Sequence, residues 1–250
     1  MSHARQLVLL LIAIHVSAGL IPPMFRTIVS EDEASTLIAA LGAKPCIREC
    51  LKPVLDGANE LDEMLPSQAL KTMCSAQKET VSCLIKQPLC SGKVVVDVAL
   101  SGLQQACGSK KPIFKLMEKC LDEKAAPVYA SCNDLCMVQS AIGNLTESAT
   151  VQKLAKLGGN PTAVAREAGP LCESILCALP CLYSGLNDVC PFSGLYTVDV
   201  MLIPLDKAIR VAESMGMRDM IKRQLPKECR PFMLRQTLQD LRHGKQIKYY

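Results

Sequence analysis

The amino-acid sequence predicts an all-α protein, a disulfide-stapled helical bundle built from two tandem Cys-rich repeats. Three observations support this fold class. Apolar residues recur at helical spacing, no segment alternates apolar and polar residues for long as a half-buried strand does, and one cysteine-containing stretch occurs twice. We therefore expect helices joined by short loops.

The repeated stretch indicates a duplication. Its copies are Cys74, Cys83 and Cys90 followed by SGKVVVDVAL, and Cys172, Cys181 and Cys190 followed two residues later by SGLYTVDVML. A Cys-x-x-x-Cys pair precedes each copy, at Cys46 and Cys50 and again at Cys132 and Cys136. We infer a tandem duplication of a unit of roughly 100 residues, which is a normal domain size.

The chain is divided accordingly into four segments. They are a signal peptide (1–18), a first Cys-rich helical repeat (19–125), a second Cys-rich helical repeat (126–241) and a basic C-terminal tail (242–250). Arg5, an apolar run over 7–16 and small residues up to Ala18 indicate the signal peptide. Because that run is about half of the ~20 residues that a spanning helix needs, we expect a secreted, extracellular protein with no stable membrane span.

Fourteen cysteines in a secreted chain indicate seven disulfide bonds. The duplication matches six cysteines in each repeat: Cys46, Cys50, Cys74, Cys83, Cys90 and Cys107 in the first, and Cys132, Cys136, Cys172, Cys181, Cys190 and Cys229 in the second. Two cysteines, Cys120 and Cys177, are left over. We predict three bonds within each repeat in the same pattern, and a Cys120–Cys177 bridge between the repeats.

In the first half, helical spacing predicts helices over 31–41, 44–55 and 67–86. Ser30 and Glu33 form a capping box at the start of the first helix. Cys46 and Cys50 lie on one face of the second helix, so each is expected to bond to a neighbouring helix. The valine run after Ser91 suits either a strand or a helix, and the flanking Ala, Leu and Gln residues favour a helix.

In the second half, Pro112 and Pro127 are each predicted to open a helix. The helix that begins at Pro127 should end at Gly143, and Asn144 should cap the next one. A helix over 170–183 corresponds to that over 67–86. The closing region, 205–241, has a helical pattern that is interrupted at Gly216, Pro226 and Pro231.

The histidine content argues against most catalytic and metal sites. Of His3, His15 and His243, the first two leave with the signal peptide. The remaining His243 lies near the terminus, where it cannot serve a triad or a Cys-His nucleophile in a preformed cleft. Asp97 and Asp199 occupy matched positions, and a solvent-facing or hydrogen-bonded role explains both. We therefore predict a non-enzymatic protein with no catalytic residues, no cofactor and no metal site.

Charge is distributed unevenly along the chain. From 216 to 250, nine bases face three acids. This basic region is either a solvated helix face with a loose tail or a docking strip for an anionic partner, such as a sulfated glycan or a lipid headgroup. The candidate strip consists of Arg230, Arg235, Arg242, Lys245 and Lys248. Nucleic acid is not an expected partner, because aromatic residues that would stack on bases form only 4% of the chain.

Two kinds of modification site occur in the sequence. Ser-Gly, the minimal attachment site for a glycosaminoglycan, occurs at Ser91, Ser101, Ser184 and Ser193, where a turn or helix-cap role is the favoured interpretation. Asn144-Leu145-Thr146 is a candidate N-glycosylation sequon.

The combination of a signal peptide, Cys46 to Leu51, and the Leu171 to Cys190 block resembles the secreted nematode proteins that carry the chondroitin-proteoglycan-4-type domain. The resemblance implies an extracellular, disulfide-rich, non-enzymatic protein associated with matrix or eggshell. The chain departs from a proteoglycan because it has no Ser-Gly repeat flanked by acids. The alternative function is a secreted helical carrier of a lipid or another apolar ligand.

Overall fold

The computed structural model describes residues 31–59, 64–87, 90 and 93–247. Within these ranges the chain forms helices and connecting loops and no strand, which confirms the predicted all-α class. The predicted signal peptide, Ser30, the Ser91-Gly92 dipeptide and Lys248 lie outside the described residues.

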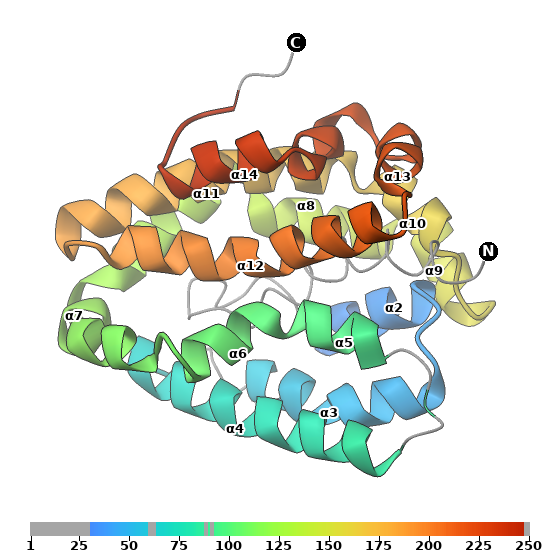
Figure 1. Ribbon diagram of the computed structural model, residues 1–250, viewed down its shortest axis with the longest axis horizontal. Coiled ribbons are helices and arrows are strands. Elements are labelled where there is room, and N and C mark those ends of the chain that lie inside the picture. The colour runs from blue at the N-terminus through green and yellow to red at the C-terminus, as the bar shows by residue number, and fades with distance from the viewer. Residues whose placement is uncertain (1–30, 60–63, 88–89, 91–92, 248–250) are drawn as a thin grey trace.

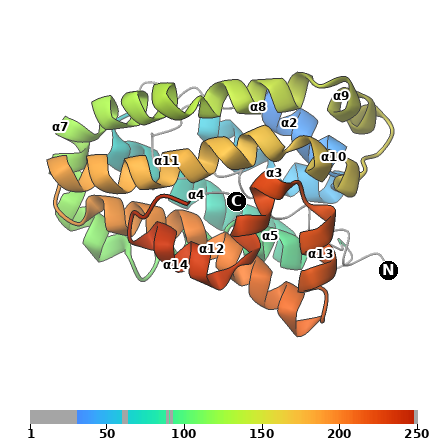
Figure 2. The ribbon, with the colours of Figure 1, turned by 90° about the horizontal axis from the view of Figure 1, so that it is seen from above.

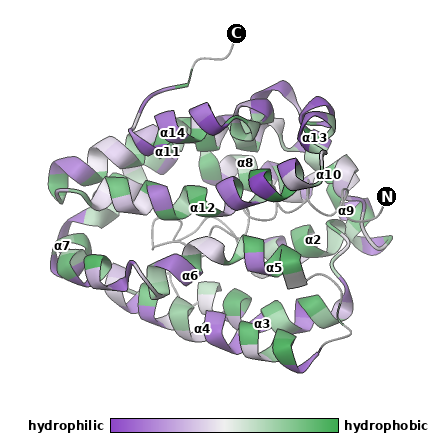
Figure 3. Ribbon diagram, viewed as in Figure 1, coloured by the Kyte–Doolittle hydropathy of each residue, from purple (hydrophilic) through white to green (hydrophobic). Residues whose placement is uncertain are grey.

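The helices follow one another with short connections (Figure 1). They are α2 (Glu31–Ala40), α3 (Pro45–Asn59), α4 (Pro66–Lys86), α5 (Lys93–Ala99), α6 (Ser101–Cys107), α7 (Lys111–Cys136), α8 (Val138–Glu147), α9 (Ala149–Lys156), α10 (Pro161–Glu167), α11 (Gly169–Val189), α12 (Ser193–Ser214), α13 (Arg218–Gln224), the 3₁₀ helix η4 (Lys227–Met233) and α14 (Arg235–Arg242). Hydrophobic and hydrophilic residues alternate along them, as in amphipathic helices (Figure 3).

Two helical hairpins organise the molecule. Helix α3 packs against α4, and helix α7 packs against α11, which also contacts α12 (Figures 1 and 2). Helix α12 lies between α11 and α6, so it joins the second hairpin to the first half of the chain. The core is divided in the same way: one cluster of buried residues includes Cys50 and Leu103, and a larger one surrounds α11 and α12.

All fourteen cysteines form disulfides, and none is free. The bonds are Cys46–Cys90, Cys50–Cys83, Cys74–Cys107, Cys120–Cys190, Cys132–Cys181, Cys136–Cys177 and Cys172–Cys229. Cys50 bonds to Cys83 of the neighbouring helix α4, as predicted, whereas Cys46 bonds to Cys90, which lies beyond the end of α4 and outside a helix. Each of the seven bonds closes either within 46–107 or within 120–229.

The predicted Cys120–Cys177 bridge is wrong. Helices α7 and α11 are antiparallel, so cysteines late in α7 meet cysteines early in α11: Cys136 bonds to Cys177, while Cys120 bonds to Cys190. Cys120 and Cys177 therefore lie towards opposite ends of this hairpin. The two halves of the chain are held together by noncovalent contacts, with no disulfide between them.

The predicted correspondence between repeats is also wrong at two cysteines. Copying the bonds of the first half would pair Cys132 with Cys190 and Cys136 with Cys181, and neither bond forms. The disulfide connectivity of the two halves does correspond if Cys120 is matched with Cys46 and Cys132 with Cys50. The additional bond is then Cys136–Cys177, and the duplication itself remains a prediction.

Two predicted helix boundaries are wrong. Helix α7 continues through Pro127, which lies on its exposed side between two cysteines that are both bonded to α11, Cys120 and Cys132. A proline removes one backbone hydrogen bond of a helix. The disulfides of Cys120 and Cys132 hold α7 in place on either side of this missing hydrogen bond. Helix α8 continues through Asn144, and the cap of α9 is Ser148, whose hydroxyl accepts a hydrogen bond from the Val151 amide at 3.2 Å.

Among the described residues, α11 is long and apolar enough to cross a membrane. In the structure it packs against α7, α12 and η4, and Cys172, Cys177 and Cys181 bond it to its neighbours. This is the environment of a central core helix.

Candidate functional site

Asp199 lies at the centre of a charged cluster that joins three parts of the fold. Its carboxylate accepts a hydrogen bond from Arg242 Nε of α14 at 2.8 Å and another from Lys110 Nζ, just before α7. The Lys110 ammonium also lies 5.6 Å from the centroid of the Tyr196 ring. Because Asp199 already binds two cations within the protein, its position indicates a structural role.

The matched aspartate, Asp97, has a different environment. At this position Lys207 Nζ donates to the backbone carbonyl of Asp97 at 3.1 Å, so the described contact does not involve the carboxylate. Both interactions connect the α5–α7 region with α12. They support the interpretation of Asp97 and Asp199 as parts of the scaffold.

The Asp199→Ala substitution is expected to lower the free energy of unfolding by about 1.5–2 kcal/mol, because it leaves Lys110 and Arg242 largely buried without their shared acceptor. Equilibrium unfolding in urea measures this change. Asp219→Ala in α13 is the control, because its carboxylate is 74% exposed beside Arg218 and such pairs contribute well under 1 kcal/mol. Equal losses in the two variants would contradict the role of Asp199.

The structure does not gather the predicted anionic-partner strip into a free cationic face. Its four described members each have a partner within the chain: Arg230 binds the Leu225 carbonyl, Arg235 binds Glu213, Arg242 binds Asp199 and Lys245 binds Asp240. The fifth member, Lys248, lies outside the described residues. Much of the basic charge predicted to face a partner is thus balanced internally.

The paired carboxylates in this region have shifted pKa values. Hydrogen bonds from Arg235 and then Arg218 hold the pKa of Glu213 below its ordinary value, and the hydrogen bond from Lys245 does the same for Asp240. A lowered pKa means that the pair stabilises the fold above the unfolded pKa and that this contribution is lost as the pH falls. At neutral pH both carboxylates are therefore ionised in the folded protein.

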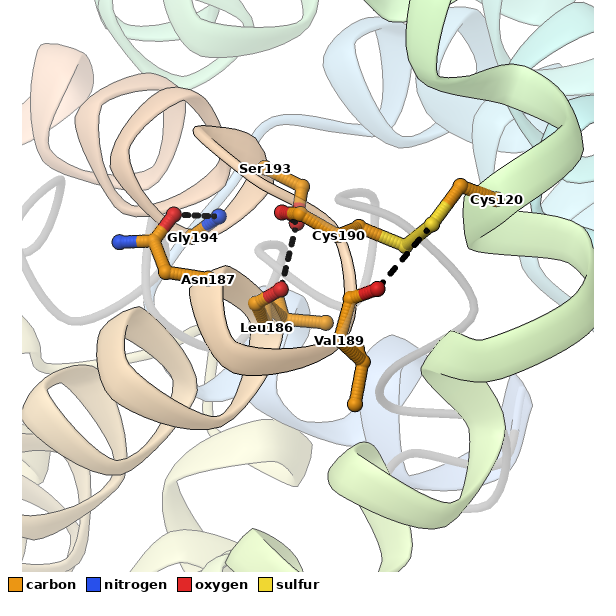
Figure 4. The surroundings of a disulfide bond; sticks show 7 residues. All are labelled: Cys120, Leu186, Asn187, Val189, Cys190, Ser193 and Gly194. Atoms are coloured by element: carbon orange, nitrogen blue, oxygen red, sulfur yellow. Dashed lines mark hydrogen bonds between the residues drawn. A yellow bond between two sulfur atoms is a disulfide. The ribbon is translucent and has the colours of Figure 1, made fainter.

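Two of the four Ser-Gly serines are buried parts of the scaffold. The hydroxyl of Ser193 donates to the carbonyls of Leu186 at 3.0 Å and Cys190 at 2.6 Å, beside the Cys120–Cys190 bond (Figure 4). Ser101 is also buried and donates to the Val98 carbonyl at 2.6 Å. Neither hydroxyl accepts a capping hydrogen bond from a helix amide, so the predicted cap role is not found at Ser101 or Ser193. Their contacts fix the turn before each helix, and they leave neither hydroxyl accessible for attachment of a glycan in the folded protein.

The remaining modification sites differ in exposure. Ser184 is exposed on α11, while Ser91 lies outside the described residues. Asn144 is exposed on α8, but the Thr146 hydroxyl of its sequon is buried and donates to the Gly143 carbonyl at 2.8 Å. Glycosylation of Asn144 remains a prediction, and it would have to precede the folding of α8.

No group of three or more His, Cys, Asp or Glu side chains within the described ranges is placed to hold a metal ion. A depression on the exposed face of α4 is lined by Gln77, Lys78, Val81, Ser82, Ile85 and Lys86. It is open to solvent and of mixed polarity, which differs from the enclosed apolar cavity expected of a lipid carrier.

A surface that the sequence analysis did not identify lies at the start of α7. Lys111, Lys115 and Lys119 are exposed there at i, i+4 and i+8, and Leu116 between them is 88% exposed. Nearby in the fold, Phe192 is 68% exposed at the turn between α11 and α12. The lysine spacing was visible in the sequence, but the exposure of Leu116 and Phe192 becomes clear only from the folded chain.

Comparison with known proteins gives one match. A family model described as chondroitin proteoglycan 4 matches residues 35–242, a range that contains all fourteen cysteines. No curated protein and no solved structure matches the chain significantly.

Proposed function

The chain belongs to the chondroitin proteoglycan 4 family, and on that premise we propose that it is a secreted, non-enzymatic extracellular protein with a structural or binding role in a matrix. The observation that carries the proposal is the complete pairing of its fourteen cysteines into seven disulfides. Such a set of bonds forms and persists in oxidising compartments and is rare in the cytosol.

A non-enzymatic role is supported by the way the polar side chains are used. The carboxylate of Asp199 is bound to two cations, and the hydroxyls of Ser101 and Ser193 are bound to backbone carbonyls of the segment that precedes each helix. A catalytic nucleophile or base must be free to contact a substrate. These residues stabilise the fold instead.

We propose that the protein binds matrix glycans and that it does not carry a glycosaminoglycan on Ser101 or Ser193. Both hydroxyls are buried and bonded, whereas attachment needs an accessible serine. Exposed lysines and arginines on several helices provide the positive charge that a sulfated chain would bind, and the formal net charge is +4.

The purified protein is expected to be retained on a chondroitin sulfate column at low salt and to elute as the salt concentration rises, because salt screens contacts between exposed charges. Arg230→Gln and Arg235→Gln combined with deletion of 245–250 test the predicted strip. The matched control removes the same number of charges elsewhere, by replacing the exposed Lys44, Lys52, Lys153 and Lys156 with glutamine. If the wild-type protein is not retained on the column, glycan binding is excluded. If the strip variant and the control variant elute at the same salt concentration, the strip is excluded as the glycan-binding site.

A further inference from the structure

The start of α7 and the α11–α12 turn form a compact surface with both apolar and cationic side chains, here called the α7 edge. It consists of Lys111, Lys115, Leu116, Lys119 and Phe192. We propose that the α7 edge docks onto an anionic lipid surface, with the lysines at the headgroups and Leu116 and Phe192 inserted at the boundary of the acyl chains. This proposal goes beyond the matrix role and does not depend on it.

The apolar part of the α7 edge is exposed. Leu116 has the largest exposed fraction among the large apolar side chains of the described chain, at 88%, and Phe192 is 68% exposed. Burial of such side chains in an apolar phase is favourable, and grouped exposed apolar residues mark surfaces that contact a partner.

Phe192 also occupies a backbone conformation that does not suit it. It precedes α12 with φ 68°, in the left-handed region that Gly and Asn adopt most readily. An exposed phenylalanine at such a position is unfavourable both for its backbone and for its contact with water. A ligand that covers the ring would account for a phenylalanine at this position.

The cationic part of the α7 edge is available to a ligand. Lys111, Lys115 and Lys119 follow one face of α7, and none of them forms an ion pair with a described residue. The neighbouring cation Lys110 is bound to Asp199, and the neighbouring acid Glu118 is bound to Lys71 at 3.0 Å. Lys71 has the larger effect in lowering the pKa of the Glu118 carboxyl, and Lys115 also lies close enough to help lower it. The local excess of positive charge therefore comes mainly from Lys111 and Lys119.

The fold holds the two parts of the α7 edge together. The Cys120–Cys190 bond joins α7 to the end of α11 with a Cα–Cα distance of 5.9 Å. Leu116 lies one helical turn before Cys120, and Phe192 lies two residues after Cys190. The start of α7 and the α11–α12 turn occupy the same end of the molecule in both views (Figures 1 and 2). The disulfide therefore holds the two parts of the α7 edge together in the unbound protein.

The chemistry of the α7 edge favours a bilayer over a sulfated glycan. Both ligands attract lysines, but a glycan offers no apolar phase for Leu116 and Phe192. A membrane interface binds basic residues through anionic headgroups and apolar residues through the acyl boundary. The acids Glu123 and Asp188, exposed one turn beyond Lys119 and just before Cys190, limit the extent of the cationic surface.

Co-sedimentation of the purified protein with vesicles tests the proposal. We expect binding to vesicles that contain about 30% phosphatidylserine and none to pure phosphatidylcholine, because anionic lipid attracts each lysine. The combined Lys111→Glu, Lys115→Glu and Lys119→Glu variant should bind about tenfold more weakly or less. Leu116→Gln should weaken binding several-fold.

Phe192→Asn separates docking from folding. Asparagine accepts the left-handed conformation, so this variant is expected to unfold at the same or a higher temperature while it loses lipid binding. A residue with a purely structural role would show the opposite result, because its replacement would lower the unfolding temperature.

The matched control lies on α9, where Lys153, Lys156 and Leu157 are also exposed. The Lys153→Glu, Lys156→Glu and Leu157→Gln variant should bind vesicles as the wild-type protein does. Three results would overturn the proposal: no binding to anionic vesicles, equal loss in the α9 control, or binding of chondroitin sulfate at the α7 edge without binding of vesicles. If the protein is secreted with all its disulfides formed but does not bind vesicles, the membrane proposal fails and the proposed matrix role is unaffected.

Discussion

Replacing Cys172 and Cys229 together with alanine is expected to lower the free energy of unfolding by about 4 kcal/mol. The bond between them closes a separation of 57 residues and fastens η4 to α11. Both cysteines are buried, at 5% and 3% exposure, so the substitution also removes packed sulfur atoms from the core. Equilibrium unfolding in guanidinium chloride under oxidising conditions measures the difference from the wild-type protein.

The Cys136–Cys177 bond provides a matched control. It links α7 to α11 only four residues from the Cys132–Cys181 bond, which continues to join the same two helices after it is removed. The additional loop that it closes is therefore small, and a smaller loop restricts the unfolded chain less. Alanine at both positions should cost less than the loss of Cys172–Cys229, and an equal or larger cost would contradict this account.

The fold class could be predicted because it depends on local patterns. A helix repeats every 3.6 residues, and helical spacing therefore located α3, α4 and α11 from the sequence alone. The valine run was ambiguous by residue type, and its neighbours correctly favoured the helix that begins at Lys93. Boundaries near prolines were less predictable, since the helix through Pro127 depends on bonds to α11 that the local sequence does not encode.

Disulfide connectivity could not be obtained from matched positions alone. The choice of partner for Cys120 depends on the antiparallel arrangement of α7 and α11, which is a tertiary property. Matching the two Cys-x-x-x-Cys pairs by their spacing placed Cys136 opposite the wrong cysteine of α11. Spacing identifies which cysteines share a helix face, but the register between helices decides which of them bond.

The candidate sites show the same limit. Five basic residues of the C-terminal region formed a strip in the sequence, but two of them bind acids of α12: Asp199 is 43 residues from Arg242, and Glu213 is 22 residues from Arg235. The surface charge of a helix therefore depends on its neighbours in space. This is why the sequence alone does not show which basic side chains are paired in the fold.

Gly102→Ala is expected to destabilise the protein by about 2–3 kcal/mol, because α6 and α12 approach each other most closely at this glycine. A β-carbon at position 102 would lie 2.5 Å from the backbone carbonyl oxygen of Val200 and 3.3 Å from the ring of Pro204. Backbone atoms cannot move aside as a flexible side chain can. The substitution should therefore separate α6 from α12, which is one of the contacts that join the two disulfide-bonded halves.

Thermal and urea unfolding of Gly102→Ala should be compared with Gly57→Ala in α3. At Gly57 the added β-carbon meets no atom closer than 3.5 Å, so the same substitution should be neutral or stabilise by about 0.5–1 kcal/mol through the lower flexibility of the unfolded chain. No disulfide connects 46–107 with 120–229. Gly102→Ala should therefore also make the chain between Cys107 and Cys120 more susceptible to protease, while the disulfides within each half remain intact. Unchanged stability and unchanged proteolysis would show that the halves are held together at other contacts.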